Sequence, residues 1–149
     1  MTIALASDHA GYELKEGVRL FLEQRGLAYR DFGSSAGETV DYVDFGIQAM
    51  ESVVAGECDR AILFCGTGIG MSIVANKFKG IRAAVCWDLY TAEISRKHND
   101  ANCLCLGGRV LELARAIEIV ASWLDSPFEG GRHARRVDKI SELEKKKFR

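Results

Sequence analysis

The sequence lacks most of the features that would place a protein in a membrane, in the secretory pathway or on nucleic acid. No segment approaches the roughly 18 consecutive apolar residues of a membrane span. The first residues, MTIALASDHAGYELK, lack the basic segment and the uninterrupted apolar run of a signal peptide. The formal net charge is only -1, which gives no electrostatic reason to expect nucleic acid. We therefore expect a cytoplasmic protein without a membrane or nucleic-acid partner.

Cysteine spacing and proline content indicate the redox state of the thiols and the number of domains. The five cysteines are odd in number and never follow a C-x-x-C pattern, so we expect reduced thiols rather than disulfides. The chain has one proline and no low-complexity tract, and 48% of its residues are apolar. These features predict a single domain over residues 1–149 with a substantial core and no linker.

Short apolar segments alternate along the chain with segments of helical periodicity. Several of the apolar segments, such as AILF and AAVC, are apolar on both faces, which is typical of a parallel sheet covered by helices on both sides. We therefore predict a doubly wound, Rossmann-like α/β domain. Strands are expected over residues 2–7, 27–33, 58–66, 81–87 and 101–108, and helices over residues 12–26, 41–57, 71–78, 90–100, 110–124 and 133–148.

Polar residues follow four of the five predicted strands. In such sheets ligands bind outside the carboxyl ends of the strands, so these residues should converge on one edge of the sheet. They are Asp8 and His9 after the first strand, Cys65 and its glycines after the third, Trp87 and Asp88 after the fourth, and Gly107, Gly108 and Arg109 after the fifth.

The segment ILFCGTGIGMS contains three alternating glycines, Gly66, Gly68 and Gly70, directly after Cys65. A dinucleotide fingerprint would read G-x-G-x-x-G after the first strand and would require an acidic residue about 20 positions later, and neither is present. A P-loop lysine is absent, and a cysteine phosphatase would have arginine where Met71 stands. We call residues 66–70 the glycine loop, and we expect it to turn sharply and to present backbone N–H groups to a ligand.

Cys65 is the candidate reactive group of this loop. Nearby N–H donors favour a thiolate and stabilise a developing oxyanion. A thiolate so placed suits proton abstraction next to a carbonyl, and it also suits attack on an acyl group. The alternative is that Cys65 is a small buried residue at the end of a strand, the interpretation that we give to the other four cysteines.

All three histidines lie in polar clusters, SDHAG, RKHND and GRHARR. His98, which ends a predicted helix, has a side chain suited to proton transfer, and Asp8 is a second candidate. Arg132 and Arg136 are four residues apart on one helical face, and their guanidinium groups suit the oxygens of a phosphate. Arg109 is a third candidate phosphate ligand. Salt bridges to nearby carboxylates would explain the Arg132 and Arg136 pair equally well. The residues alone therefore indicate a small phosphorylated substrate, a thiolate base, an oxyanion-binding loop and an auxiliary acid.

The chain resembles the ribose/galactose isomerase family, and within it the type B ribose-5-phosphate isomerases. The resemblance spans nearly the whole chain, through SDHAGYELK, VDYVDFG, CGTGIGMSIVANKFKGIRAAVC, SRKHNDANCLCLGGRV and FEGGRHARRV. It implies a three-layer α/β/α fold on a five-stranded parallel sheet and an aldose–ketose isomerase that interconverts ribose 5-phosphate and ribulose 5-phosphate. It also implies homodimers, or dimers of dimers, with active sites shared between subunits, and neither a metal nor an organic cofactor.

The resemblance also implies roles for individual residues. Cys65 would move the proton between C1 and C2, and the enediolate would be held by Thr67 and by the backbone of Gly66, Gly68, Ile69 and Gly70, with help from Asn99. His98 and Asp8 would open the sugar ring, and Tyr42 would line the pocket. The phosphate would be bound by His9, Arg109, Arg132 and Arg136, some of them from the neighbouring subunit.

Two features leave alternatives open. Val43 and the pair Trp87 and Asp88 depart from the pattern of the family, and Trp87 could change the preferred sugar if it points into the pocket. The family that the chain resembles also includes enzymes for allose 6-phosphate and galactose 6-phosphate, so a six-carbon substrate is the second hypothesis. A non-catalytic phosphate-binding module with a structural or redox-sensing Cys65 is the third.

Overall fold

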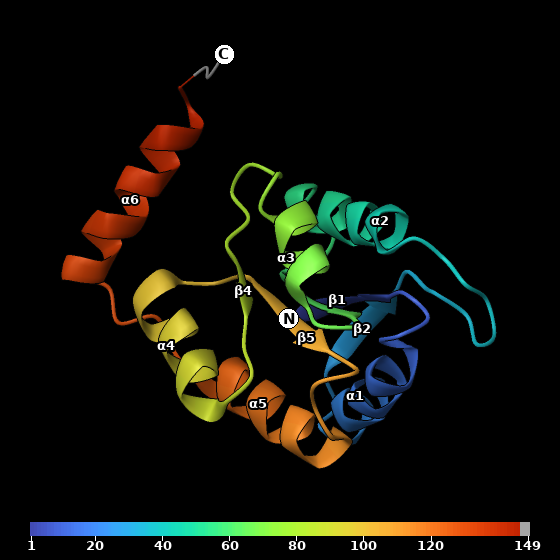
Figure 1. The fold of residues 1–149 in the computed structure, drawn as a ribbon. Coiled ribbons are helices and arrows are strands. Elements are labelled where there is room, and N and C mark those ends of the chain that lie inside the picture. The colour runs from blue at the N-terminus through green and yellow to red at the C-terminus, as the bar shows by residue number, and fades with distance from the viewer. Residues whose placement is uncertain (147–149) are drawn as a thin grey trace.

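The computed structural model describes residues 1–146 and contains five strands and six helices (Figure 1). All strand pairs are parallel, and the strands lie in the order β2-β1-β3-β5-β4. In chain order the elements are β1 Thr2–Ser7, α1 Tyr12–Gln24, β2 Ala28–Asp31, α2 Tyr42–Val54, β3 Arg60–Cys65, α3 Ile69–Ala75, β4 Ala83–Val85, α4 Leu89–Asn99, β5 Cys103–Gly107, α5 Leu113–Asp125 and α6 Arg132–Glu144. The predicted doubly wound α/β fold is confirmed.

Alternation of side chains along the strands builds a core on each face of the sheet. Ile3 and Leu5 of β1 face one core, which is covered by α1, α4 and α5, whereas Ala4 and Ala6 face the other, covered by α2 and α3. Trp123 of α5 is the largest fully buried side chain. Since both faces are buried, the central strands are apolar over most of their length. The sheet lies between the two helical layers in Figure 1.

The ends of several elements differ from the predicted ranges. Helix α3 begins at Ile69, two residues earlier than predicted, because Gly68 adopts a left-handed conformation (φ 85°) that turns the chain directly into the helix. Strand β4 is shorter than predicted and lies at the edge of the sheet, where the amide side chain of Asn76 pairs with both backbone groups of Ala83. For the predicted helix 133–148, α6 ends at Glu144, and residues 147 and 148 lie outside the described residues.

Helix α6 stands apart from the three layers. It extends away from the rest of the chain in Figure 1 and packs against α4. Ile140 and Leu143 on α6 are exposed, and with Ile81 and Ala84 they line a groove of about 520 Å³. Within residues 1–146, no helix combines the length and the apolar character needed to cross a membrane.

Candidate functional site

The glycine loop connects the end of β3 to the start of α3 and surrounds the Cys65 thiol. The Gly68 amide donates a hydrogen bond to Cys65 Sγ at 3.1 Å, and the Ile69 amide donates to Thr67 Oγ1 at 3.2 Å. Cys65 is 3% exposed. The loop therefore directs a backbone N–H group at the Cys65 sulfur.

Close packing against β5 explains why glycine is required around this loop. A Cβ atom on Gly107 would lie 2.7 Å from backbone atoms of Thr67, and one on Gly68 would lie 3.1 Å from the backbone of Cys105. Real Cβ atoms rarely or never approach backbone so closely. The loop therefore lies directly on the end of β5, and this contact fixes the position of the thiol.

Two predicted residues follow β1 beside the glycine loop. The Asp8 amide donates to the carbonyl of Phe64, the residue before Cys65, and the buried Asp8 carboxylate accepts from the Gly11 amide at 2.9 Å. His9 is exposed, and its Nδ1 accepts from the Val40 amide at 3.4 Å. Asp8 is thus fixed in position, while the His9 ring borders a cavity of about 520 Å³.

Residues from α2, β4 and β5 complete this edge. The Tyr42 ring covers Gly70, where a Cβ would lie 2.7 Å from the ring. The Arg109 amide donates to the Gly66 carbonyl at 2.9 Å, and the Arg109 guanidinium packs against the same glycine. Trp87, half exposed, donates from Nε1 to the Thr67 carbonyl at 3.4 Å. The predicted convergence at the carboxyl ends of the strands is confirmed, and we call this edge the carboxyl rim.

Four predicted site residues lie away from the carboxyl rim of their own chain: His98 and Asn99 at the end of α4, and Arg132 and Arg136 on α6. The last turn of α4 leads into the amino end of β5, and the carbonyl of Asn99 accepts from Arg82 Nε at 3.0 Å, just before β4. At about 3.3 Å per residue, the five residues of β5 separate this end from the carboxyl rim by roughly 13 Å. A single chain therefore does not bring Cys65 together with His98, Asn99, Arg132 and Arg136.

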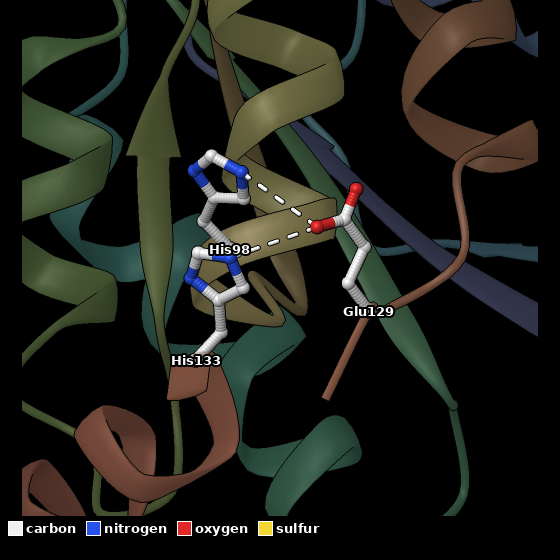
Figure 2. A group of neighbouring side chains, drawn as sticks. All are labelled: His98, Glu129 and His133. Carbon is white, nitrogen blue, oxygen red and sulfur yellow. Dashed lines mark ion pairs between the residues drawn. The ribbon is translucent and has the colours of Figure 1, made fainter. Parts of the chain in front are cut away.

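His98 belongs instead to a cluster with two residues that were given no role from the sequence, Glu129 and His133 (Figure 2). The His98 and His133 rings stack with centroids 4.0 Å apart and an interplanar angle of 8°. Burial, with the neighbouring His98 and Arg132, lowers the pKa of His133. Thirty-five positions separate the two histidines, and paired glycines interrupt the chain between Glu129 and His133, so no sequence spacing indicates the cluster.

Comparisons with known proteins agree with one another. A family profile described as Ribose/Galactose Isomerase matches residues 3–140. Ribose-5-phosphate isomerase B of Escherichia coli is 46% identical over 145 residues, which is 97% of each chain. The solved structure of Clostridium thermocellum ribose-5-phosphate isomerase B is 56% identical, has a TM-score of 0.95 and covers 97% of this chain and 98% of its own. A Mycoplasma genitalium ribose-5-phosphate isomerase B, solved with bound ribulose 5-phosphate, is 39% identical with a TM-score of 0.93, covering 98% of this chain and 97% of that one.

Proposed function

The chain belongs to the ribose/galactose isomerase family, and on this premise we propose that it interconverts ribose 5-phosphate and ribulose 5-phosphate. The main structural support for this reaction is the Cys65 thiol at the end of β3, which accepts a hydrogen bond from the Gly68 amide. A sulfur supported in this way is suited to act as a base. The relative solved with ribulose 5-phosphate supports a small phosphorylated sugar as the ligand.

The reaction requires one proton to move between two carbons. Cys65, as the thiolate, removes the C2 proton of the open-chain aldose, and the electron pair left behind forms an enediolate across C1 and C2. The resulting thiol returns the proton to C1, while O1 gains a proton and O2 loses one, which completes the ketose. Thr67 and the amides of Gly66 and Gly70 stabilise the negative oxygen, while the Gly68 amide is directed at the sulfur and the Ile69 amide at Thr67 Oγ1.

Ring opening and phosphate binding use the remaining predicted residues. Asp8 and His98 transfer the protons that open the furanose, because only the open chain has a carbonyl group. Asn99 assists at the enediolate, and Tyr42 lines the pocket. The phosphate is bound by His9 and three guanidinium groups, those of Arg109, Arg132 and Arg136.

A homodimer, or a dimer of dimers, with shared active sites accounts for the separation of these residues. His98 and Arg132 lie at the opposite end of β5 from Cys65, which supports the proposal that a second copy of the chain supplies them. Exposed apolar side chains lie near both sets of residues and support this arrangement. They are Ile69 and Ile73 on α3, beside the carboxyl rim, and Ile140 on α6. We also propose a cytoplasmic location, in keeping with five free thiols.

Solvent exchange at C2 tests the proposed chemistry directly. Incubated with ribose 5-phosphate in deuterated water, the protein should form ketose, and recovered sugar should carry deuterium at the exchanged carbon. Cys65→Ala should lower kcat by about 10²–10⁴-fold while leaving the melting temperature nearly unchanged. Ketose formation at the wild-type rate by Cys65→Ala would exclude Cys65 as the base. Phosphate-dependent stabilisation without turnover or exchange would instead identify a binding module.

The length of the sugar depends on the space beside Trp87. Its indole contacts the Thr67 carbonyl at the carboxyl rim, where a large side chain favours the shorter, five-carbon substrate. The ratio of kcat/KM for ribose 5-phosphate to that for allose 6-phosphate should exceed one and should fall in Trp87→Ala. A ratio below one in the wild-type protein would favour the six-carbon alternative.

A further inference from the structure

We infer that His98, Glu129 and His133 form a reversible binding site for a divalent transition-metal ion such as Zn²⁺, and that the bound ion inhibits the enzyme. The three residues come from three segments: the last turn of α4, the connection between α5 and α6, and the first turn of α6 (Figure 2). Backbone hydrogen bonds hold these segments together. The Glu129 amide donates to the Lys97 carbonyl at 3.1 Å, and the His133 amide donates to the Gly130 carbonyl at 3.0 Å.

The three side chains offer a compact set of metal ligands. Nε2 of His98 and Nε2 of His133 lie 3.9 Å and 3.6 Å from the same carboxylate oxygen of Glu129, and all three ligand atoms lie within 4.8 Å of one another. Ligands of a tetrahedral zinc ion lie about 3.3 Å apart, given metal–ligand bonds of about 2.0–2.1 Å. Coordination would require rotations of both side chains that tilt the imidazoles out of their stack, so that their Nε2 lone pairs converge on one point.

The cluster is incompletely paired without a cation. Neither imidazole reaches hydrogen-bond distance of Glu129, because both separations exceed 3.5 Å. His133 is 5% exposed, and its Nδ1 has no hydrogen-bond partner among residues 1–146. A metal ion would bind Nε2 of both rings and the Glu129 oxygen that lies 3.9 Å and 3.6 Å from them, and it would leave His133 Nδ1 unpaired.

Local charge permits a cation but limits its affinity. His98 lies at the carboxyl end of α4, where the helix dipole favours positive charge, and Glu129 contributes a full negative charge. Arg132 and Arg136 carry positive charge on the same helix as His133 and oppose the ion. Two imidazoles and one carboxylate favour Zn²⁺ over Mg²⁺ or Ca²⁺, and three protein ligands leave one coordination position open. These features fit a reversible inhibitor site rather than a structural metal.

Inhibition follows from the role of His98, and this part of the inference rests on the proposed function. A metal ion bound to Nε2 of His98 occupies the nitrogen lone pair that ring opening needs for proton transfer. It also fixes the first turn of α6, which carries Arg132, to α4. Both effects lower turnover without any change at Cys65.

Metal binding is tested first without substrate, by titrating Zn²⁺ into the purified full-length chain against a chromophoric chelator. We expect one Zn²⁺ per chain, and at least tenfold weaker binding in both Glu129→Gln and His133→Gln. The matched control is Glu142→Gln, an exposed carboxylate on α6, which should bind as the wild type does. Cys65→Ala should also bind normally. Wild-type affinity in both cluster variants, or loss of binding in Cys65→Ala, would overturn the site.

Inhibition is measured separately in the isomerase assay. Zn²⁺ should lower the wild-type rate, a chelator should restore it, and Glu129→Gln should need at least tenfold more Zn²⁺ for the same fractional loss relative to its own metal-free rate. Equal sensitivity of Glu129→Gln and the wild type would overturn inhibition through this cluster. Absence of isomerase activity in metal-free protein would refute the proposed function instead, while the binding titration would still decide the metal site.

Discussion

Mixing two inactive variants would establish whether the active site is shared between subunits. Cys65→Ala removes the proposed base at the carboxyl rim. The double variant Arg132→Ala/Arg136→Ala removes two proposed phosphate ligands at the start of α6. Loss of the base lowers kcat by about 10²–10⁴-fold, and each lost charge-assisted contact costs about 1.5–3 kcal/mol. Neither variant alone should therefore retain more than a small fraction of wild-type activity.

The symmetry of the proposed dimer sets the activity that a mixture should recover. In a two-fold symmetric dimer, a mixed pair has one site with both defects and one site with none. Random exchange of equal amounts makes about half of the dimers mixed, so the sample should recover about one quarter of wild-type activity. Mixed dimers isolated with two affinity tags should have about half.

The assay is ketose formation after the subunits have exchanged. A matched control pairs Cys65→Ala with Asp8→Ala, whose defects both lie on the carboxyl rim, and this mixture should recover nothing. If isolated mixed dimers of the first pair were as inactive as their parents, each active site would have to be built within one chain. The spatial separation of His98 and Arg132 from Cys65 would then need another explanation.

Three further predictions concern the loop, the start of α4 and the buried thiols. Gly107→Ala should destabilise the protein by about 1–3 kcal/mol in urea unfolding, because its Cβ would lie 2.7 Å from the backbone of the glycine loop, and unchanged stability would contradict this packing. The Thr91 amide donates to the Asp88 carboxylate and holds the pKa of Asp88 below its usual value. Wild type should therefore melt at a higher temperature than Asp88→Asn at neutral pH, and this difference should disappear as the pH falls below about 3.9. A difference in melting temperature that persists in acid would refute this role of the Asp88 charge. Burial raises the pKa of the fully buried Cys105 thiol well above its usual value, so iodoacetamide should modify Cys105 more slowly than Cys65 in the native protein. Mass spectrometry showing equal rates at these two cysteines would contradict this order.

The correspondence between sequence and structure is closest where local pattern carries the information. Apolar strands alternating with amphipathic helices predicted the parallel sheet, because burial on both faces requires strands without polar alternation. The glycine loop was predicted next to Cys65 because its conformation depends on glycine at particular positions, as the left-handed Gly68 confirms. The contacts of Asp8 with the end of β3 and of Arg109 with the glycine loop followed from the rule that parallel strands end at one edge.

What the sequence by itself determined was the set of chemical groups and the order of the elements that carry them. Only the tertiary structure decided which groups meet. Helix α4 runs back along the sheet, so His98 lies at the opposite end of β5 from Cys65, although both residues were predicted to act on one substrate. The same path of the chain stacks His98 on His133 beside Glu129, three residues that no local pattern connects. The physical reason is that residue type and spacing are local properties, whereas side chains distant in sequence are brought together by the packing of whole elements.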